Sequence, residues 1–400
     1  MPVYALKGVV QHYAWGGNRF IPNLLKVENT TDVPYAEYWM GTHPKGPSKV
    51  KTAKGDLLLS DLINLEPSKK LGFFPAIKFN NRLPFLFKVL DVKKMLSIQA
   101  HPIKAEAEKG YKRENEEGIA LDAPNRTYRD DNHKPEVMVA LTDFWLLHGF
   151  RPTDEIQEVL EIPEFQSLVS YFQNTDIFQI YKAIMEMPQE RVNDVLAPLW
   201  DRLKPLYDKG KLEKKTPDYW AALAFCDYTQ NGQYDRGIFS IYLFNLVHLK
   251  KGEGIFQQAG VPHAYLEGGN MELMANSDNV FRGGLTQKHI DVPELLKHLV
   301  FDPVYPIRLS GTSVSPLEKI FKTPAPDFEL SQLTISQRDT YRFTNPKSAE
   351  ILILMEGTAT VHAENKYLHL SSGACFFVEA GTSYTITTSE NCQLFKAKVP

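Results

Sequence analysis

The stretch HLKKGEGIFQQAGVPHAY, residues 248–265, recurs without a gap as HLSSGACFFVEAGTSYTI, residues 369–386. Each copy has a strand-like run, a glycine turn, an aromatic strand, a second glycine turn and another strand, which is typical of a jelly roll or small barrel. Two copies of one unit predict two related β-structures in this chain. The copies differ at one chemically important place, because His263 of the first copy corresponds to Tyr384 of the second.

The segments around the repeat differ in texture. Residues 1–151 are mostly short alternating or β-rich runs, interrupted by one helical patch, KAEAEKGYKRENEEG, at residues 104–118. From residue 152 to about residue 230, apolar side chains recur at three- and four-residue spacing, which predicts helices, and strands resume from Arg236. The sequence therefore predicts a mainly β fold: a discontinuous β-domain over 1–151 and 236–300, a helical insert over 152–235, and a second β-domain over 301–400.

Composition excludes several classes of partner. The chain has 45 Lys and Arg against 48 Asp and Glu, a net charge of −3, so it lacks the basic surface that nucleic acids or anionic membranes require. Its three cysteines are too scattered for a disulfide framework, which indicates free thiols in a reducing compartment. The N-terminus does not have the pattern of a signal peptide, and the longest apolar run, residues 237–249, is too short for a membrane span. We therefore expect a cytoplasmic protein.

A second informative stretch is LSIQAHP, residues 96–102, which alternates like a β-strand but carries polar side chains on one face. Gln99 and His101 are two residues apart and should point the same way. Pro135 forces an extended backbone, so Glu136 should begin a strand and face inward, and His263 follows a Gly-Val-Pro turn at a strand entrance. Two imidazoles, a carboxylate and an amide oxygen form a plausible ligand set for Zn²⁺ with one position left open. Each residue alone could equally be a hydrogen-bonded core residue.

Several lysine and arginine side chains occur at positions where a charged group is unusual in a folded core. Lys88 interrupts the apolar run LPFLFKVLD, and Lys134 lies two residues before Glu136 on the same predicted face. Arg282 precedes a pair of glycines, and Lys288 follows six residues later, so both could meet a phosphate or a developing oxyanion. Glu272 alternates with apolar residues and should be an inward carboxylate suited to acid–base work. The alternatives are ion pairs of these cations with nearby Asp278, Asp291 or Glu294, and for Lys88 a side chain whose ammonium reaches solvent. Glu272 could instead pair with Arg282.

Five long blocks of the chain resemble the type I mannose-6-phosphate isomerase (phosphomannose isomerase) family. The blocks are QHYAWGG (11–17), AEYWMGTHPKGPS (36–48), LPFLFKVLDVKKMLSIQAHP (83–102), DDNHKPEVMVALT (130–142) and PHAYLEGGNMELMANSDNVFRGGLTQKHID (262–291). The resemblance implies a cupin-type fold, in which a catalytic jelly-roll domain carries a helical insert and is followed by a cupin-like domain. Because the second glycine unit has Glu379 and Tyr384 in the Pro and His places of the cupin pattern, the C-terminal domain should be metal-free.

The same resemblance implies a site and a reaction. One zinc ion per chain would be held by Gln99, His101, Glu136 and His263, and mannose 6-phosphate and fructose 6-phosphate would be interconverted. The catalytic arginine of the family falls on Arg282. Phosphate-binding positions fall on Lys88, Ser97 and Lys288, and pocket-lining positions fall on Lys134, Tyr265 and Glu272. We expect a monomer acting on a small sugar phosphate, with neither nucleic acid nor membrane as a partner.

The expected chemistry moves a proton between C1 and C2 of the open-chain sugar through an enediol. A cation must meet the oxygen on which charge develops, and zinc or Arg282 could supply it. Glu272, Lys134 or a hydroxide on the metal could take the proton. Two other readings stay open at this point: an iron-dependent oxygenase of similar fold, because two histidines and a carboxylate also hold Fe(II), and a non-catalytic sugar-binding module.

Overall fold

The computed structural model describes residues 2–168 and 176–400. It is mainly β with several helices, as the sequence predicts. The sheet that contains the candidate site has ten strands, with the order β10-β9-β12-β6-β3-β2 and with β7, β8, β11 and β13 attached off this path. Its strands are β2 (Val9–Gln11), β3 (Glu37–Gly41), β6 (Phe85–Val92), β7 (Ile98–Ala100), β8 (Glu136–Ala140), β9 (Phe144–Phe150), β10 (Phe244–Leu249), β11 (Gly254–Gln257), β12 (His263–Ala275) and β13 (Phe281–Gly284).

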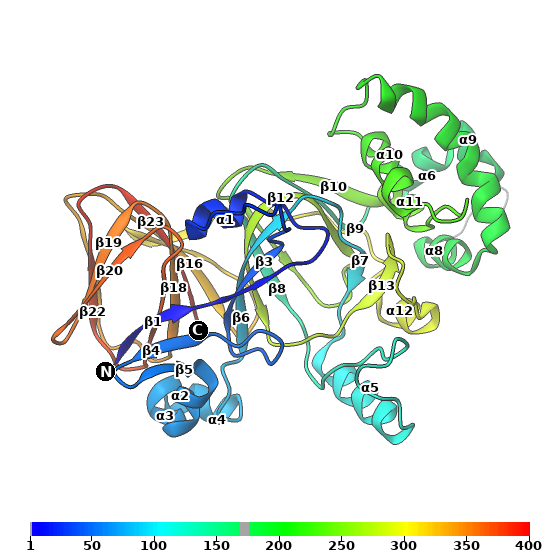
Figure 1. Ribbon diagram of the computed structural model, residues 1–400. Helices are drawn as coiled ribbons and strands as arrows, with labels where there is room; N and C mark the ends of the chain where they lie inside the picture. The colour runs from blue at the N-terminus through cyan, green and yellow to red at the C-terminus, as the bar shows by residue number, and fades with distance from the viewer. Residues whose placement is uncertain (1, 169–175) are drawn as a thin grey trace.

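A nine-stranded sheet and a four-stranded sheet contain the C-terminal strands, which are orange to red in Figure 1. The nine-stranded sheet has the order β14-β15-β16-β23-β18-β21-β1-β4-β5, so three strands from the N-terminal region complete it. Its strands are β1 (Val3–Lys7), β4 (Lys49–Thr52), β5 (Gly55–Leu58), β14 (Thr312–Ser315), β15 (Glu318–Phe321), β16 (Glu329–Ile335), β18 (Glu350–Glu356), β21 (Cys375–Val378) and β23 (Cys392–Lys398). The smaller sheet consists of β17 (Thr340–Phe343), β22 (Tyr384–Thr387), β19 (Thr358–Ala363) and β20 (Lys366–Ser371).

Helices gather beyond β7, β10 and β13, as the green ribbons of Figure 1 show. They are α6 (Thr153–Leu160), the 3-10 helix η1 (Pro163–Phe165), α8 (Ile177–Glu186), α9 (Gln189–Asp208), α10 (Pro217–Tyr228) and α11 (Gly237–Leu243). Their apolar residues share one buried cluster with Ile98, Ala100 and Phe281. The outer faces of β7 and β13 therefore rest on the helical unit, which holds the polar faces of these strands toward the rest of the sheet.

Some local expectations were wrong. α11 occupies residues for which strands were expected, and all seven of its residues are buried, so their sequence has no period that separates a helix from a strand. The first 151 residues contain α5 (Lys104–Glu116), as expected, and also four short helices that the sequence did not reveal. These are α1 (Phe20–Leu25), α2 (Leu59–Leu65), α3 (Pro67–Leu71) and α4 (Phe73–Lys78); a further short helix, α12 (Val292–His298), follows β13. No helix among the described residues is both long and apolar enough to cross a membrane.

Candidate metal and substrate site

Strand register brings the nominated side chains together. Along its second half β12 pairs with β6 on one edge and β8 on the other, and at its start it pairs with β7. His263 lies opposite Gln99, and Glu272 lies opposite Lys88. Directly opposed residues of antiparallel strands point to the same face, so residues far apart in sequence line one concave surface.

Three of these side chains form a compact group. The ligand atoms of His101, Glu136 and His263 all lie within 4.8 Å of one another, and all three residues are buried. His101 Nε2 lies 3.6 Å from Glu136 Oε1, and His263 Nε2 lies 3.6 Å from Glu136 Oε2. These distances exceed hydrogen-bond length, which leaves room between the atoms.

The Nδ1 atoms of both imidazole rings already have hydrogen-bond partners. His101 Nδ1 donates to the carbonyl of Asn279 at 2.8 Å, and His263 Nδ1 donates to the carbonyl of Val261 at 3.0 Å. A neutral imidazole that donates from Nδ1 presents a lone pair at Nε2, and His101 Nε2 is buried without a hydrogen-bond partner among the described residues. Two lone pairs facing one carboxylate repel it unless a cation lies between them. This donor set, with carbonyls fixing the ring orientation, fits a divalent metal.

The charges of the group suit metal binding. Burial lowers the pKa of His101 well below its usual value, and the ammonium of Lys134 acts in the same direction. Burial alone would raise the pKa of Glu136, but Lys134, whose Nζ lies 2.9 Å from Oε1, and the two histidines hold it well below its usual value. The result is a neutral imidazole beside an ionised carboxylate, which are the forms that bind metals.

A cavity of about 100 Å³ opens over this group, and we call it the inner cavity. It is lined by eight nominated residues, Lys88, Ser97, Gln99, Lys134, Glu136, His263, Tyr265 and Glu272. The amide nitrogen of Gln99 on β7 lies 3.5 Å from Oγ of Ser97, which immediately precedes this strand, and both side chains face the inner cavity. The nominated residues His101, Arg282 and Lys288 do not line this cavity.

Within the inner cavity, Lys88 is held between two acids. Its Nζ lies 3.1 Å from Glu272 Oε2 and 3.4 Å from Glu37 Oε2, and Tyr265 donates to Glu272 Oε1 at 2.8 Å. Burial alone would lower the pKa of Lys88, yet Glu37 and Glu272 raise it above its usual value, so this lysine stays charged. Burial raises the pKa of Glu272, although Lys88 opposes the shift. A carboxyl whose pKa is moved toward neutrality can both accept and return a proton.

A larger outer cavity of about 670 Å³ shares Glu37, Leu96, Ser97 and Gln99 with the inner one. Arg282 and Lys288 line it, and Arg282 pairs with Gln99 in the register of β13 and β7. Burial lowers the pKa of Arg282, and Arg129 adds to the effect. Burial also lowers the pKa of Lys288, with Arg282, Arg129 and Lys45 acting in the same direction. No carboxylate contributes to either shift, so these cations repel one another until an anion arrives.

Reasoning from the sequence did not nominate Glu37, Arg129 or Asn279. Glu37 starts β3, in which all five residues are buried, so alternation gives no signal there. Only the pairing of β3 with β6 in the structure shows that the Glu37 carboxylate reaches Lys88. Arg129 lies in a loop with no periodic pattern.

Asn279 joins two loops behind the metal-binding group. Its side-chain Nδ2 donates to the carbonyls of Asp130 at 2.8 Å and Asn132 at 2.9 Å, and its Oδ1 accepts from Arg129 N at 2.7 Å. Its own carbonyl holds His101 Nδ1, and its side chain is fully buried. We call this residue and its contacts the Asn279 clamp. The clamp links the loop that precedes Glu136, the ring of His101 and the loop that precedes Arg282.

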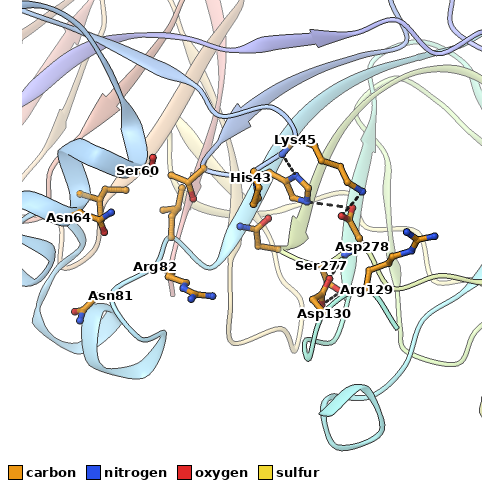
Figure 2. Close-up of a pocket in the computed structure, with 15 residues that line it drawn as sticks. His43, Lys45, Ser60, Asn64, Asn81, Arg82, Arg129, Asp130, Ser277 and Asp278 are labelled. Carbon is orange, nitrogen blue, oxygen red and sulfur yellow. Dashed lines mark hydrogen bonds and ion pairs between the residues drawn. The ribbon is translucent and has the colours of Figure 1, made fainter. Parts of the chain in front are cut away.

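The outer edge of the clamp lines a separate hollow, shown in Figure 2. There Asp130 accepts from Ser277 Oγ at 2.7 Å, and Asp278 lies 2.8 Å from Lys45 Nζ and 3.4 Å from His43 Nε2. Both acids are therefore already paired, and they keep the loop of residues 276–279 in place. The hollow is the outer side of the wall that supports the metal-binding group.

Comparison with known proteins identifies the relatives of this chain. Residues 3–153 match the family model of the phosphomannose isomerase type I catalytic domain. Mannose-6-phosphate isomerase of Escherichia coli (strain K12) is 37% identical over 381 residues, which are 94% of each chain, and the Homo sapiens enzyme is 35% identical over 97% of this chain and 96% of its own. A crystal structure of mannose 6-phosphate isomerase from Salmonella typhimurium, bound to its substrate fructose 6-phosphate and to zinc, is 33% identical, covers 100% of both chains and has a TM-score of 0.89. These similarities extend over nearly the whole length, and they confirm the resemblance found in the sequence: the chain belongs to the type I mannose-6-phosphate isomerase family.

Proposed function

We propose that the protein interconverts mannose 6-phosphate and fructose 6-phosphate by moving a proton between C1 and C2 through an enediol, with one bound Zn²⁺. The observation that carries the proposal is the buried group of His101, Glu136 and His263 beside two connected cavities. The relative from Salmonella typhimurium, whose structure superimposes on this chain with a TM-score of 0.89, binds fructose 6-phosphate and zinc. We further propose a cytoplasmic monomer that uses neither nucleic acid nor membrane, in keeping with the net charge of −3.

The proposed architecture is a cupin-type double barrel. Residues 1–151 and 236–300 would form the catalytic barrel, residues 152–235 the helical insert and residues 301–400 the second barrel. The pairing of β8 with β11 supports this division, because it repeats in the pairing of β18 with β21. The strands β1, β4 and β5 lie in the sheet of the C-terminal strands, so the N-terminal region also contributes to the second barrel.

Zinc would be held by the two histidine Nε2 atoms, a Glu136 oxygen and the amide oxygen of Gln99. The ion would supply a fixed positive charge that polarises a sugar oxygen. Arg282 pairs with Gln99 and is the protein group proposed to meet the negative charge that develops on the substrate oxygen. Glu272 is the proposed proton-transfer group, since it is buried at the inner cavity and its pKa is raised; Lys134 is the alternative.

The phosphate is proposed to lie in the outer cavity. Lys288 lines this cavity, and its pKa is lowered by partial desolvation and by neighbouring cations, so a phosphate dianion would relieve repulsion at this end. Lys88 is less suited to bind the phosphate than the family resemblance implies, because two carboxylates already engage its ammonium. With the phosphate at Lys288, C1 and C2 would extend toward Ser97, Gln99 and the metal.

A coupled assay of mannose 6-phosphate conversion to fructose 6-phosphate, with and without a chelator, tests the proposed function. Activity should require the metal and return when Zn²⁺ is restored. Oxygen uptake with a sugar substrate and Fe(II) would instead support the oxygenase. Sugar phosphate binding with no turnover in zinc-loaded protein would support a binding module.

Replacing Lys288 with methionine is expected to raise KM for mannose 6-phosphate by about 10- to 100-fold, because a charged hydrogen bond to phosphate contributes roughly 1.5–3 kcal/mol. The kcat value should change little, since the phosphate is bound equally in the ground state and the transition state. Steady-state kinetics on zinc-loaded protein measure both constants. A large fall in kcat with unchanged KM would contradict the assignment of Lys288 to phosphate binding.

Replacing Asn279 with alanine is expected to lower the affinity for Zn²⁺ by about 10- to 100-fold, the usual effect of removing an outer partner of a metal ligand. The His101–Asn279 carbonyl contact would remain possible, but the loop that presents it would lose its side-chain bonds to residues 129–132. Competition with a chromophoric chelator measures the affinity.

Asn29 provides the matched control. Its side chain also joins loop backbones, donating to Asn18 O at 3.1 Å and Val33 O at 2.8 Å, but it lines neither cavity. The Asn29→Ala variant should lose stability and keep its zinc affinity. Equal zinc affinity in both variants would show that the Asn279 clamp does not support the metal site.

A further inference from the structure

The two copies of the β-unit can be aligned residue by residue through strand register. In the first, Gln257 of β11 pairs with Glu136; in the second, Val378 of β21, which is the repeat partner of Gln257, pairs with Glu350. Glu350 of β18 is therefore the counterpart of the proposed metal-binding carboxylate.

The same reasoning locates two further counterparts. Tyr384 replaces His263 in the repeat, and Phe343 lies opposite Tyr384 as Gln99 lies opposite His263. Three of the four proposed zinc ligands thus have identified counterparts in the C-terminal unit: a carboxylate that is kept, a phenol and a phenyl ring. These three side chains define the place that corresponds to the metal.

An ammonium group lies at this place. Lys396 Nζ is 3.8 Å from Glu350 Oε1 and 4.0 Å from the ring centroid of Phe343, and Tyr384 donates to Glu350 Oε2 at 2.6 Å. Lys396 and Glu350 are both fully buried. Glu350 Oε1 has no hydrogen-bond partner among the described residues, so its contact with the ammonium is purely electrostatic.

Strand register also shows which residue of the first unit corresponds to Lys396. Lys396 pairs with Leu352 as Glu272 pairs with Met138, so a cation stands in the C-terminal unit where the first unit has a carboxylate. The ammonium of Lys396 also pairs with Glu318 Oε1 at 2.8 Å and donates to the hydroxyl of Tyr341 at 2.9 Å. Glu318 lies opposite Leu333 as Glu37 lies opposite Leu90, so the buried acid at the Glu37 position is kept and again faces a lysine.

We infer that the C-terminal unit retains the frame of a divalent-metal site in which the ammonium of Lys396 takes the place of the ion. The inference rests on the proposed metal site of the first unit. A buried carboxylate requires a partner of opposite charge, and a lysine on a neighbouring strand supplies one without any binding equilibrium. The ring face of Phe343 attracts a cation where an amide oxygen would ligate a metal. Removing the ammonium and restoring an imidazole should therefore open a second zinc site.

The test uses the full-length chain in two variants, Lys396→Ala with Tyr384→His, and Lys396→His alone. The second variant leaves Tyr384 in place, and its shorter imidazole vacates the position of the ammonium while offering a nitrogen ligand beside it. Each is purified, given excess ZnCl₂ and dialysed; zinc per chain is counted by elemental analysis, and melting is followed with and without zinc. Zinc per chain should rise by about one above wild type. The melting temperature without zinc should fall by on the order of 5–10 °C, and zinc should restore most of it.

Lys70→Ala is the matched control. Lys70 is also a buried lysine paired with a buried glutamate, Glu379, which a tyrosine, Tyr4, contacts as well, but it has no counterpart among the proposed metal ligands. This variant should lose stability without gaining zinc.

The result that overturns the inference is zinc content equal to wild type in both Lys396 variants, or failure of both to fold whether or not zinc is present. Wild-type protein that binds no zinc, or whose zinc is unaffected by loss of His101, would instead contradict the proposed function. The first and second sites are thus judged by different variants.

Discussion

Replacing His101 with alanine is expected to abolish both zinc binding and isomerase activity, lowering kcat/KM by about 10³-fold or more. The magnitude follows from the several kcal/mol of charge stabilisation that a bound metal supplies to a transition state. The Nε2 of the removed ring is buried without a hydrogen-bond partner among the described residues and faces Glu136, and its loss leaves Glu136 facing a single imidazole. Elemental analysis of the dialysed variant and the coupled assay measure the two effects.

His248 is the control for general damage. It lies on β10, stacked on Trp145 at 4.1 Å between ring centroids, and it lines neither cavity. The His248→Ala variant should keep its zinc and its activity. Normal turnover in a zinc-free His101→Ala protein would end the proposal that a metal takes part in the reaction.

The local part of the site was accessible from sequence because strand periodicity is a local property. LSIQAHP alternates, and in the structure Ile98 and Ala100 are in the core while Ser97 and Gln99 face the inner cavity. Pro135 fixes the start of β8, so the orientation of Glu136 followed as well. The duplicated stretch similarly predicted the second β-unit, since its glycine turns recur at fixed spacing.

What sequence could not supply is which strands become neighbours. The family resemblance implied a phosphate-binding role for Lys88, and no local pattern indicated that the pairing of β6 with β3 and β12 places two carboxylates beside it. β1, β4 and β5 likewise join the sheet of the C-terminal strands, a long-range pairing that no local pattern encodes. The short helices α1 to α4 were missed for a related reason, since segments of five to seven residues have too few turns to show a period.

Replacing Arg282 with alanine is expected to lower kcat by about 10²- to 10³-fold while zinc content stays at the wild-type level, a loss that matches one preorganised donor to an oxyanion. Arg282 lines the outer cavity, lies opposite Gln99 in the register of β13 and β7, and has Arg129 as a neighbouring cation. Burial and Arg129 lower its pKa, but an arginine remains protonated at neutral pH, so it is unsuited to act as a base. Its charge would therefore be available to the oxygen that becomes negative in the proposed reaction.

The Arg282→Lys variant and the Lys288→Met variant separate the two roles open to a cation in the outer cavity. Lysine keeps the charge but loses the planar fork, so Arg282→Lys should recover only part of kcat. Lys288→Met should change KM instead. If Arg282→Ala raised KM and left kcat near wild type, Arg282 would bind the phosphate together with Lys288. The charge that stabilises the proposed enediolate would then have to come from the metal or from Lys134, whose ammonium lies beside Glu136.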